Sequence, residues 1–406
     1  MANLSSVQLI EPFIKQWTFT IDPETLIDNQ EPITSSALTG TNEPVSSPQY
    51  PILHLTFNQD HTCFSAITNH GYDVRVYKCE PFLEQHIFTM DPGADIRAVE
   101  MLFRSNSFAL LPQYPTTVAR VMLVCDDPDD ERERFDKLYF TMEVKAVRLR
   151  GDEIVLVFLQ NINVYTRPVL KPLHQIRTVH NPKGLCEVSQ ISRLLVCPGV
   201  HKGQVRVEHY GLKRTVFIEA HSSTIACLAL TTDGRFLATS GSKGSLIRLF
   251  NTSDGSLLQE LRRGTRGAEI HSLAFSSTAQ WLAVSSDRGT VHVFRLSLDS
   301  GNERPESPET KPSSSSALSP FSFIRGVLPK YFQSQRSVAQ IHLPKGCPYI
   351  VAFGHQQNTI VVVGMDGSFI RCQFDPVNGG NMTQIECRNF LPIAGRSLIT
   401  DTVTNF

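Results

Sequence analysis

The chain has 406 residues, of which 41% are hydrophobic and 19% charged, and its formal net charge is −1. The near-neutral charge argues against a nucleic-acid binder, because affinity for nucleic acids depends on neutralising many phosphates. The low charged fraction excludes a wholly disordered chain, and nine cysteines without a CxxC pair favour reduced, buried thiols over a zinc site or a disulfide framework.

The N-terminal extension, residues 1–49, differs in composition from the rest of the chain. Residues 22–49 are rich in Pro, Ser, Thr and acids and show no period, so we expect a largely flexible segment. Residues 1–17 lack the basic start and the apolar stretch of a signal peptide. No apolar run approaches the ~18 residues that a membrane span needs. These features predict a cytoplasmic protein.

From Tyr50 onwards, short runs rich in Val, Ile, Phe and Thr alternate with turns of Gly, Asp, Asn and Ser. Typical runs are ILHLTF (52–57), CFSAIT (63–68) and AVEMLF (98–103). Apolar runs of about five to eight residues between such turns are typical of half-buried strands. No long amphipathic helix is visible, so the sequence predicts an all-β chain.

The acidic stretch Asp126–Glu131 is the most obvious candidate for a metal site. Its spacing does not match a calcium-binding loop, and crowded carboxylates beside a proline more often form a solvated turn. The chain also lacks a nucleophile elbow, a P-loop, an HExxH motif and a dinucleotide-binding fingerprint. We therefore expect no enzymatic activity, no metal and no cofactor.

Two stretches, residues 224–251 and 269–296, share one order of strands and turns and begin 45 residues apart. This spacing is typical of the four-stranded blades of propellers. Residues 50–390, without one insertion, divided by about 45 predict a seven-bladed β-propeller of the WD-repeat type. A C-terminal tail, residues 391–406, follows it. Two β-sandwich domains are the structural alternative.

The strongest local signal is Leu261-Arg262-Arg263-Gly264, at the junction between the two repeats. Adjacent side chains on a strand point to opposite faces, so Arg262 should face the blade before the junction and Arg263 the blade after it. A guanidinium fork suits two phosphate oxygens. Each arginine has companions in its own repeat, which suggests two anion pockets: His221, Ser245 and Arg248 before the junction, and Ser285, Thr290 and His292 after it. The alternative is that the arginines pair with neighbouring acids and brace two blades.

One long insertion, residues 297–336, interrupts the repeats. Its first part is rich in Pro and Ser and should be disordered. Its second part, residues 321–336, is apolar with three cations and no acid, which suits a segment that enters a lipid interface. The residues expected to insert are Phe321, Phe323, Ile324, Val327 and Leu328. The alternative is that GVLPKYF (326–332) packs on the edge of its blade.

The sequence resembles the PROPPIN family, also called the WIPI family, of seven-bladed propellers that bind polyphosphoinositides. The Phe/Leu-Arg-Arg-Gly motif of that family is matched by Leu261–Gly264. Other matching phrases follow in order along about residues 50–390, and the last three are most similar to plant-type autophagy members. They are NQDHTCFSAITNHGYDVRVYKCEPF (58–82), VEMLFRSN (99–106), VKAVRLRGDEIVL (144–156), WLAVSSDRGTVHVF (281–294), GVLPKYF (326–332) and VAFGHQQNTIVVVGMDGSF (351–369).

The resemblance implies a function and assigns residues to it. The first site would consist of His221, Ser245, Arg248 and Arg262, and the second site of Arg263, Ser285, Thr290 and His292. Gly241 stands where many relatives carry a serine, which shifts or weakens hydroxyl donation in the first site.

The implied ligands are phosphatidylinositol 3-phosphate and phosphatidylinositol 3,5-bisphosphate. The implied partners are an autophagy lipid-transfer protein or a conjugation-complex scaffold. The protein would be peripheral on the preautophagosomal structure, the endosome or the vacuole membrane. A generic WD-repeat interaction scaffold without lipid specificity is the alternative function.

Overall fold

The strands of this protein are short because turn residues interrupt every apolar run. The computed structural model describes residues 52–68, 73–89, 96–105, 107–112, 119–125, 134–140, 142–167, 169–298 and 335–391. Within them every regular element is a strand. The expected N-terminal extension, the acidic stretch 126–131 and the apolar residues Phe321, Phe323, Ile324, Val327 and Leu328 lie outside the described residues, as does nearly all of the C-terminal tail.

The first half of the described chain forms three antiparallel four-stranded sheets. The first contains β1 (Ile52–Phe57), β2 (Cys63–Thr68), β3 (Asp73–Lys78) and β4 (Leu83–Thr89). The second contains β5 (Ile96–Met101), β6 (Ser107–Pro112), β7 (Ala119–Cys125) and β8 (Arg134–Phe140). The third contains β9 (Ala146–Arg150), β10 (Glu153–Val157), β11 (Asn161–Thr166) and β12 (Pro172–Arg177).

The second half forms four more sheets. The fourth contains β13 (Glu187–Val188), β14 (Leu194–Pro198), β15 (Gln204–His209) and β16 (Arg214–Glu219). The fifth contains β17 (Ile225–Leu230), β18 (Phe236–Gly241), β19 (Leu246–Asn251), β20 (Leu257–Arg262) and β24 (Gln335–Arg336). The sixth contains β21 (Ile270–Phe275), β22 (Trp281–Ser286), β23 (Thr290–Arg295), β25 (Ala339–His342) and β29 (Gly380–Asn381). The seventh contains β26 (Tyr349–Phe353), β27 (Thr359–Gly364), β28 (Ser368–Gln373) and β30 (Thr383–Asn389).

Burial changes across each sheet in the way a propeller requires. The second strands β18, β22 and β27 are buried at every residue, because both of their faces pack against neighbouring sheets. The outer strand β16 alternates exposed and buried side chains, since only one of its faces is covered. This accounts for the continuous apolar runs in the middle of each repeat and the alternating ones at its end.

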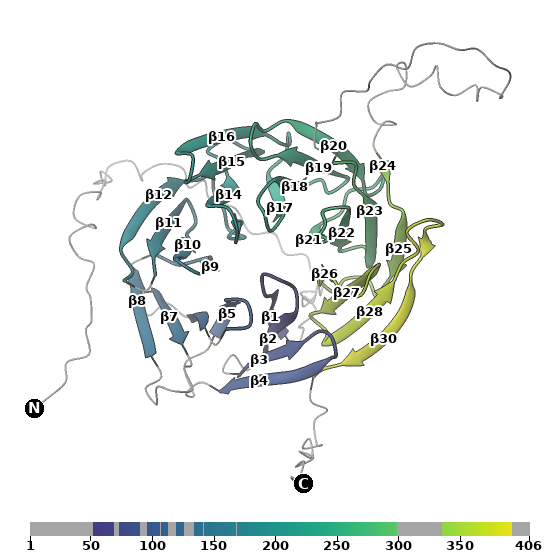
Figure 1. The fold of residues 1–406 in the computed structure, drawn as a ribbon, viewed down its shortest axis with the longest axis horizontal. Helices are drawn as coiled ribbons and strands as arrows, with labels where there is room; N and C mark the ends of the chain where they lie inside the picture. Colours follow the sequence, from purple (N-terminus) through teal and green to yellow (C-terminus); the bar gives the residue numbers. More distant parts are fainter. Residues whose placement is uncertain are drawn as a thin grey trace, which may run out of the picture. The chain divides into compact units, whose positions relative to one another are not determined.

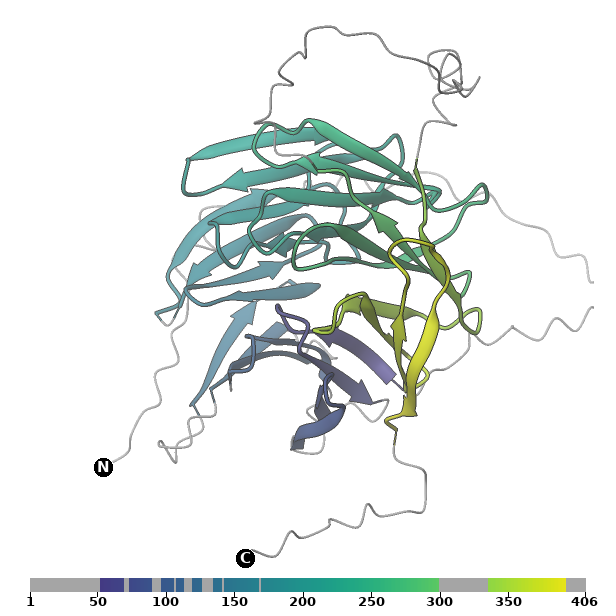
Figure 2. The ribbon, with the colours of Figure 1, turned by 45° about the vertical axis from the view of Figure 1, so that its right-hand side comes forward.

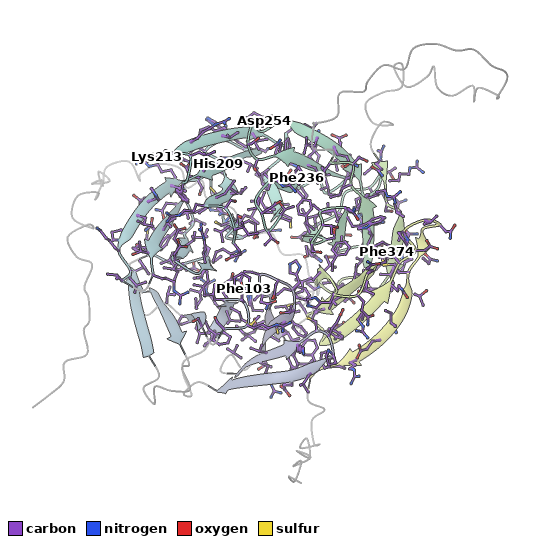
Figure 3. The ribbon with its side chains drawn as sticks, viewed as in Figure 1. Phe103, His209, Lys213, Phe236, Asp254 and Phe374 are labelled. Atoms are coloured by element: carbon purple, nitrogen blue, oxygen red, sulfur yellow. The ribbon has the colours of Figure 1, made fainter. Side chains whose placement is uncertain are left out.

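The sheets form a closed ring around a central space, which Figure 1 shows face-on and Figure 2 shows after a turn of 45°. Each sheet contributes its first strand to the centre, where β1, β5, β9, β13, β17, β21 and β26 contact one another in that order and β26 contacts β1. Figure 3 places the Phe103 side chain toward the central space and Asp254, in the turn after β19, at the outer rim. The prediction of an all-β propeller is confirmed.

Packing between the first and last sheets closes the ring. Phe64 and Tyr77 of the first sheet share a buried cluster with Phe369 of β28 and with Phe390. The Tyr77 hydroxyl donates to the Phe390 carbonyl oxygen over 3.2 Å. The last sheet is built from residues 349–389 alone, so its four strands are consecutive in the sequence apart from the short β29.

Two short strands tie neighbouring sheets together. β24 pairs in parallel with the end of β20, and β29 pairs in parallel with β25. β24 is therefore the point where the chain rejoins the ring after the insertion. No helix of the described residues is long and apolar enough to cross a membrane.

Candidate anion-binding sites

The fifth sheet carries polar residues on the face that looks toward the fourth sheet. Strand register pairs Thr239 with Arg248, Arg248 with Glu260, and Leu246 with Arg262. Side chains of directly paired residues lie on the same face of a sheet. Leu237 and Phe250 share this face and pack with Val216 and Ile218 of β16. The first site is therefore built between the fourth and fifth sheets.

Arg248 is held in place by two interactions in the first site. Its Nε donates to Glu260 Oε2 over 2.9 Å, and its Nη1 donates to the Ala220 carbonyl oxygen over 2.6 Å. Its side chain keeps 28% exposure. Because a guanidinium has five N–H donors, Arg248 retains donors for a ligand.

His221 follows β16 and lies beside Arg248. Its Nε2 is 2.9 Å from Thr239 Oγ1. Burial, and after it the positive charge of Arg248, lower the pKa of His221 to about 4. His221 is therefore neutral at pH 7, and an anion that binds beside it would favour its protonated form.

Arg262 is buried, with 7% exposure. Burial and the positive charge of Arg336 lower its pKa, and Glu260 opposes them. β24 pairs Arg336 with Arg262, so a second guanidinium lies on the same face of the fifth sheet.

A groove of about 380 Å³ lies against this face. Its walls include Arg248 and Glu260 of the fifth sheet and Phe217, Glu219 and Ala220 at the end of β16. Glu219 is engaged by Gln204 Nε2 over 2.7 Å. Of the predicted first-site residues, Arg248 lines this groove.

Ser245 and Gly241 flank the turn between β18 and β19. Ser245 is half-buried, and its carbonyl oxygen accepts the Arg263 backbone N–H over 3.0 Å. A Cβ at Gly241 would lie 2.4 Å from Ser223 Oγ and 3.1 Å from the His221 ring. Ser223 thus brings a hydroxyl to the place where Gly241 has no side chain.

The second site lies on the face of the sixth sheet that looks toward the fifth. Thr290 pairs with Ser286, and His292 pairs with Val284. Val284 and Phe294 on this face pack with Leu261 of β20. Thr290, His292 and Ser286 therefore share the face that Arg263 approaches.

Arg263 reaches the second site from the end of β20. Its Nε donates to the Gly244 carbonyl oxygen over 3.0 Å and its Nη2 to the Arg266 carbonyl oxygen over 2.6 Å. Burial lowers its pKa, Asp287 acts against this, and Arg288 adds to it. Arg263 is oriented by backbone groups and keeps further donors.

His292 connects the second site to the end of the insertion. Its Nδ1 is 3.1 Å from Ser337 Oγ. Burial, Arg263 and His342 lower the pKa of His292 to about 4. The positive charge of Arg263 is thus one cause of the low pKa of His292.

Ser285 is not brought together with the other residues of the second site. It shares its strand face with Ala283, which packs toward the seventh sheet, and its Oγ donates to the Tyr349 carbonyl oxygen over 2.6 Å. The neighbouring Ser286 lies on the correct face, and its buried Oγ has no hydrogen-bond partner among the described residues. Ser286 is thus the serine that the fold places beside Thr290.

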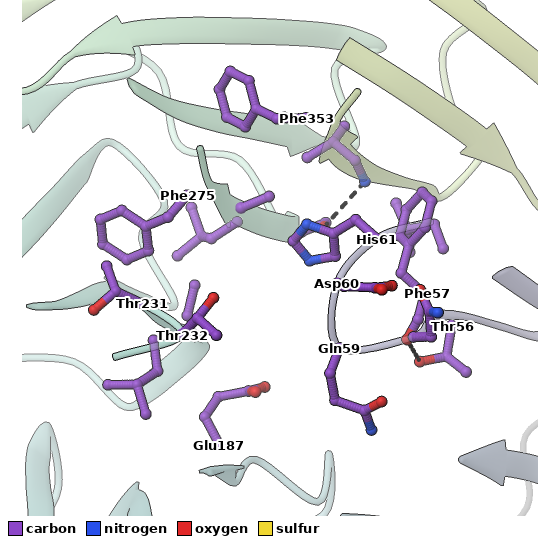
Figure 4. Close-up of a pocket in the computed structure, with 18 of the residues that line it drawn as sticks. Thr56, Phe57, Gln59, Asp60, His61, Glu187, Thr231, Thr232, Phe275 and Phe353 are labelled. Carbon is purple, nitrogen blue, oxygen red and sulfur yellow. Dashed lines mark hydrogen bonds between the residues drawn. The ribbon is translucent and has the colours of Figure 1, made fainter. Parts of the chain in front are cut away.

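A larger cavity, of about 540 Å³, occupies the centre of the ring. Figure 4 shows the His61 ring and the Asp60 carboxylate directed into it, with Glu187 across from them. Arg148 lies between Glu187 and Glu100, with N–O distances of 3.5 and 3.8 Å. Burial raises the pKa of Glu100 to about 7 and lowers that of His61. This lining has more carboxylates than cations, so it suits a phosphate less than the rim does.

The sequence profile of the PROPPIN family matches residues 52–390. The chain belongs to the PROPPIN family. It is 43% identical over 352 residues to autophagy-related protein 18e of Arabidopsis thaliana, covering 84% of this chain and 88% of that one. It is 29% identical over 347 residues to autophagy-related protein 18 of Dictyostelium discoideum, covering 82% and 91%.

Two solved structures share the fold. Hsv2 of Kluyveromyces marxianus matches with a TM-score of 0.65 and 22% identity, over 85% of this chain and all of that one. The structure of KlAtg21 in complex with the coiled-coil of AgAtg16 matches with a TM-score of 0.63 and 24% identity, over 83% and 98%. These likenesses support the propeller, and the relatives make this chain a member of an autophagy-related family.

Sequence reasoning missed three polar residues of this PROPPIN chain. Ser286 had a usable signal, because it lies one 45-residue repeat after Gly241 and shares the strand parity of Thr290. Glu260 also had one, since it lies two residues before Arg262 on the same strand face. Arg336 had none, because an insertion of unmatched length separates it from its partner strand.

Proposed function

We propose that this PROPPIN binds phosphatidylinositol 3-phosphate and phosphatidylinositol 3,5-bisphosphate at membranes, through the first and second sites on the propeller rim. In this proposal each of the seven sheets is one blade, and the two sites occupy the two faces at the end of β20. The observation that carries it is that β20 ends between two polar faces. Arg262 shares the strand face of Glu260, which looks toward the fourth sheet, whereas Leu261 on the other face packs against the sixth sheet, where the charge of Arg263 acts on His292.

Two sites on one rigid rim make weak headgroup contacts effective. Each basic residue near an anionic surface contributes about 1 kcal/mol, so a single site dissociates readily. Once one headgroup is held, capture of the second is intramolecular, and avidity rises without a new contact. The apolar residues Phe321, Phe323, Ile324, Val327 and Leu328 would add a hydrophobic anchor in the lipid interface.

The proposed role is non-catalytic. The protein would attach at the edge to the preautophagosomal structure, the endosome or the vacuole membrane, and recruit autophagy machinery there. The proposed partner is an autophagy lipid-transfer protein or a conjugation-complex scaffold. The structure of KlAtg21 in complex with a coiled-coil of AgAtg16 supports a partner that presents a coiled-coil.

The competing function is a WD-repeat scaffold without lipid specificity, in which the arginines brace the sheets. The Arg248–Glu260 ion pair and the two carbonyl contacts of Arg263 favour it. Flotation of the full-length protein with vesicles that differ only in inositol phosphorylation separates the two functions. Selective flotation with the 3-phosphate and 3,5-bisphosphate lipids supports the lipid function, and equal flotation with all vesicles, or none, contradicts it.

A further inference from the structure

The chain returns from the insertion directly beside the first site. β24 pairs in parallel with β20, with Gln335 opposite Leu261 and Arg336 opposite Arg262. Neighbouring strands lie about 4.8 Å apart, and paired residues project to the same face. Arg336 therefore extends the row of polar side chains on the fifth sheet that already contains Arg248 and Arg262.

This row has an excess of positive charge. Three guanidinium groups, Arg248, Arg262 and Arg336, share the face with one carboxylate, Glu260. Glu260 already accepts the Arg248 Nε–H over 2.9 Å. Arg336 is exposed, so its side chain can reach a ligand from solvent. Two guanidinium groups on neighbouring strands of one face can both donate to an anion that lies between them.

The backbone around Arg336 is fixed between the two sites. Gln259 Nε2 donates to Gln335 Oε1 on one side. On the other side, Ser337 Oγ contacts His292 Nδ1, and the Val338 N–H donates to the Val293 carbonyl oxygen over 2.8 Å. Residues 335–338 thus bridge the fifth and sixth sheets, which presents Arg336 in one position rather than on a free loop.

We propose that Arg336 is a phosphate-binding residue of the first site, where it and Arg262 hold one phosphate monoester of an inositol headgroup between them. This inference rests on the proposed function, since it names a further ligand contact within the same site. Two planar forks on adjacent strands can each donate to a different oxygen of one phosphate.

The test measures binding of soluble inositol 1,3-bisphosphate, the headgroup of the 3-phosphate lipid, to the full-length chain by calorimetry. The second site is silenced with Arg263→Gln, so that the first site is measured alone. In that background Arg336→Gln should weaken binding about fivefold, and Arg336→Lys should recover part of the loss. Arg235→Gln is the matched control and should leave first-site binding unchanged. Arg235 is an exposed arginine that directly precedes β18, at the end of the strand away from Gly241, and it pairs with Asp233.

A structural role for Arg336 would give a different pattern. If Arg336 only braces β24, Arg336→Gln lowers the melting temperature of the ligand-free protein. If it binds phosphate, that temperature stays the same or rises, because a repulsive neighbour of Arg262 has been removed. A shared phosphate also predicts that Arg262→Gln with Arg336→Gln weakens binding by less than the product of the single effects.

Each outcome decides one of the two proposals. Unchanged first-site affinity in Arg336→Gln, with a parent that binds the headgroup, overturns the role of Arg336 and leaves the proposed function standing. If the unmodified full-length protein binds neither the soluble headgroup nor any phosphoinositide vesicle, the proposed function is overturned, and the role of Arg336 with it.

Discussion

The two candidate sites lie at corresponding positions of two successive repeats, yet they contain different polar groups. The candidate first site contains Arg248 and Arg262, with Arg336 proposed as a third guanidinium, and the carboxylates Glu260 and Glu219. A glycine, Gly241, stands where its counterpart has Ser286. The second site has one arginine, with hydroxyls from Ser286 and Thr290 and a neutral histidine. Under the proposed function, two repeats keep an anion site in the same position while differing in the balance of hydroxyl donors and charged groups.

The largest expected effect removes both arginines at once. Arg262→Gln with Arg263→Gln should weaken attachment to vesicles carrying the 3-phosphate lipid about a hundredfold, because avidity requires both sites. Flotation measures the loss, and a thermal melt is its control. An unchanged melting temperature fits ligand binding by the two arginines, whereas unfolding of the variant would show that they brace the sheets.

The histidines of the two sites predict a pH dependence of stability. His221 and His292 have a pKa of about 4 in the folded protein, lowered from 6.5 mainly by burial. The folded state binds fewer protons than the unfolded chain between these values, so the free energy of unfolding falls as pH falls through this window. His292→Gln should reduce the fall between pH 7 and pH 5 by about 2 kcal/mol.

Urea unfolding of wild type and His292→Gln at both pH values measures this difference. The contribution of Glu100 to the free energy of unfolding has the opposite pH dependence. Its pKa is raised to about 7, so it stabilises the fold at low pH and this stabilisation is lost as pH rises. It is common to both proteins and cancels in the comparison. An equal fall in the two proteins would show that His292 does not titrate in this window.

Substituting the two serines of β22 one at a time distinguishes a role in headgroup binding from a role in packing. Ser286→Ala should weaken headgroup binding there about tenfold, since a hydrogen bond to a charged group is lost. Ser285→Ala should leave binding unchanged and lower the free energy of unfolding by about 1 kcal/mol, because its bond to Tyr349 is lost. Calorimetry in an Arg262→Gln background and urea unfolding check the pair. The reverse pattern would assign Ser285, not Ser286, to the site.

The smallest expected effect restores the missing serine. Gly241→Ser places a side chain 2.4 Å from the present position of Ser223 Oγ, so one hydroxyl enters as the other is displaced. First-site affinity should change less than about threefold. Calorimetry in an Arg263→Gln background measures it. A tenfold gain would mean that the glycine limits binding in the first site.

The fold was predictable because the apolar runs and turn residues within each repeat indicate where its strands begin and end. Two stretches begin 45 residues apart, and their second strands are mostly apolar. Together these features predict a propeller. The opposite directions of Arg262 and Arg263 follow from the alternation along a strand. The same alternation puts Ser286, and not the predicted Ser285, on the strand face of Thr290.

Other features depend on contacts that no local pattern records. Arg336 lies opposite Arg262 because a two-residue strand after the long insertion pairs in parallel with β20. The position of Glu260 on the strand face of Arg262 can be read from the sequence, but its ion pair with Arg248 depends on the register of β19 on β20. The central cavity draws its carboxylates from separate sheets. Contacts between residues this far apart in the sequence form only when the ring is closed, so no pattern in one sequence predicts them.

Counting bound headgroups tests the central claim most directly. Calorimetric titration of the full-length protein with soluble inositol 1,3-bisphosphate should give two binding events per chain. Arg262→Gln and Arg263→Gln should each leave one event, and the double variant none. A stoichiometry that neither substitution alters would contradict the account, because the phosphate would then bind away from the two faces at the end of β20.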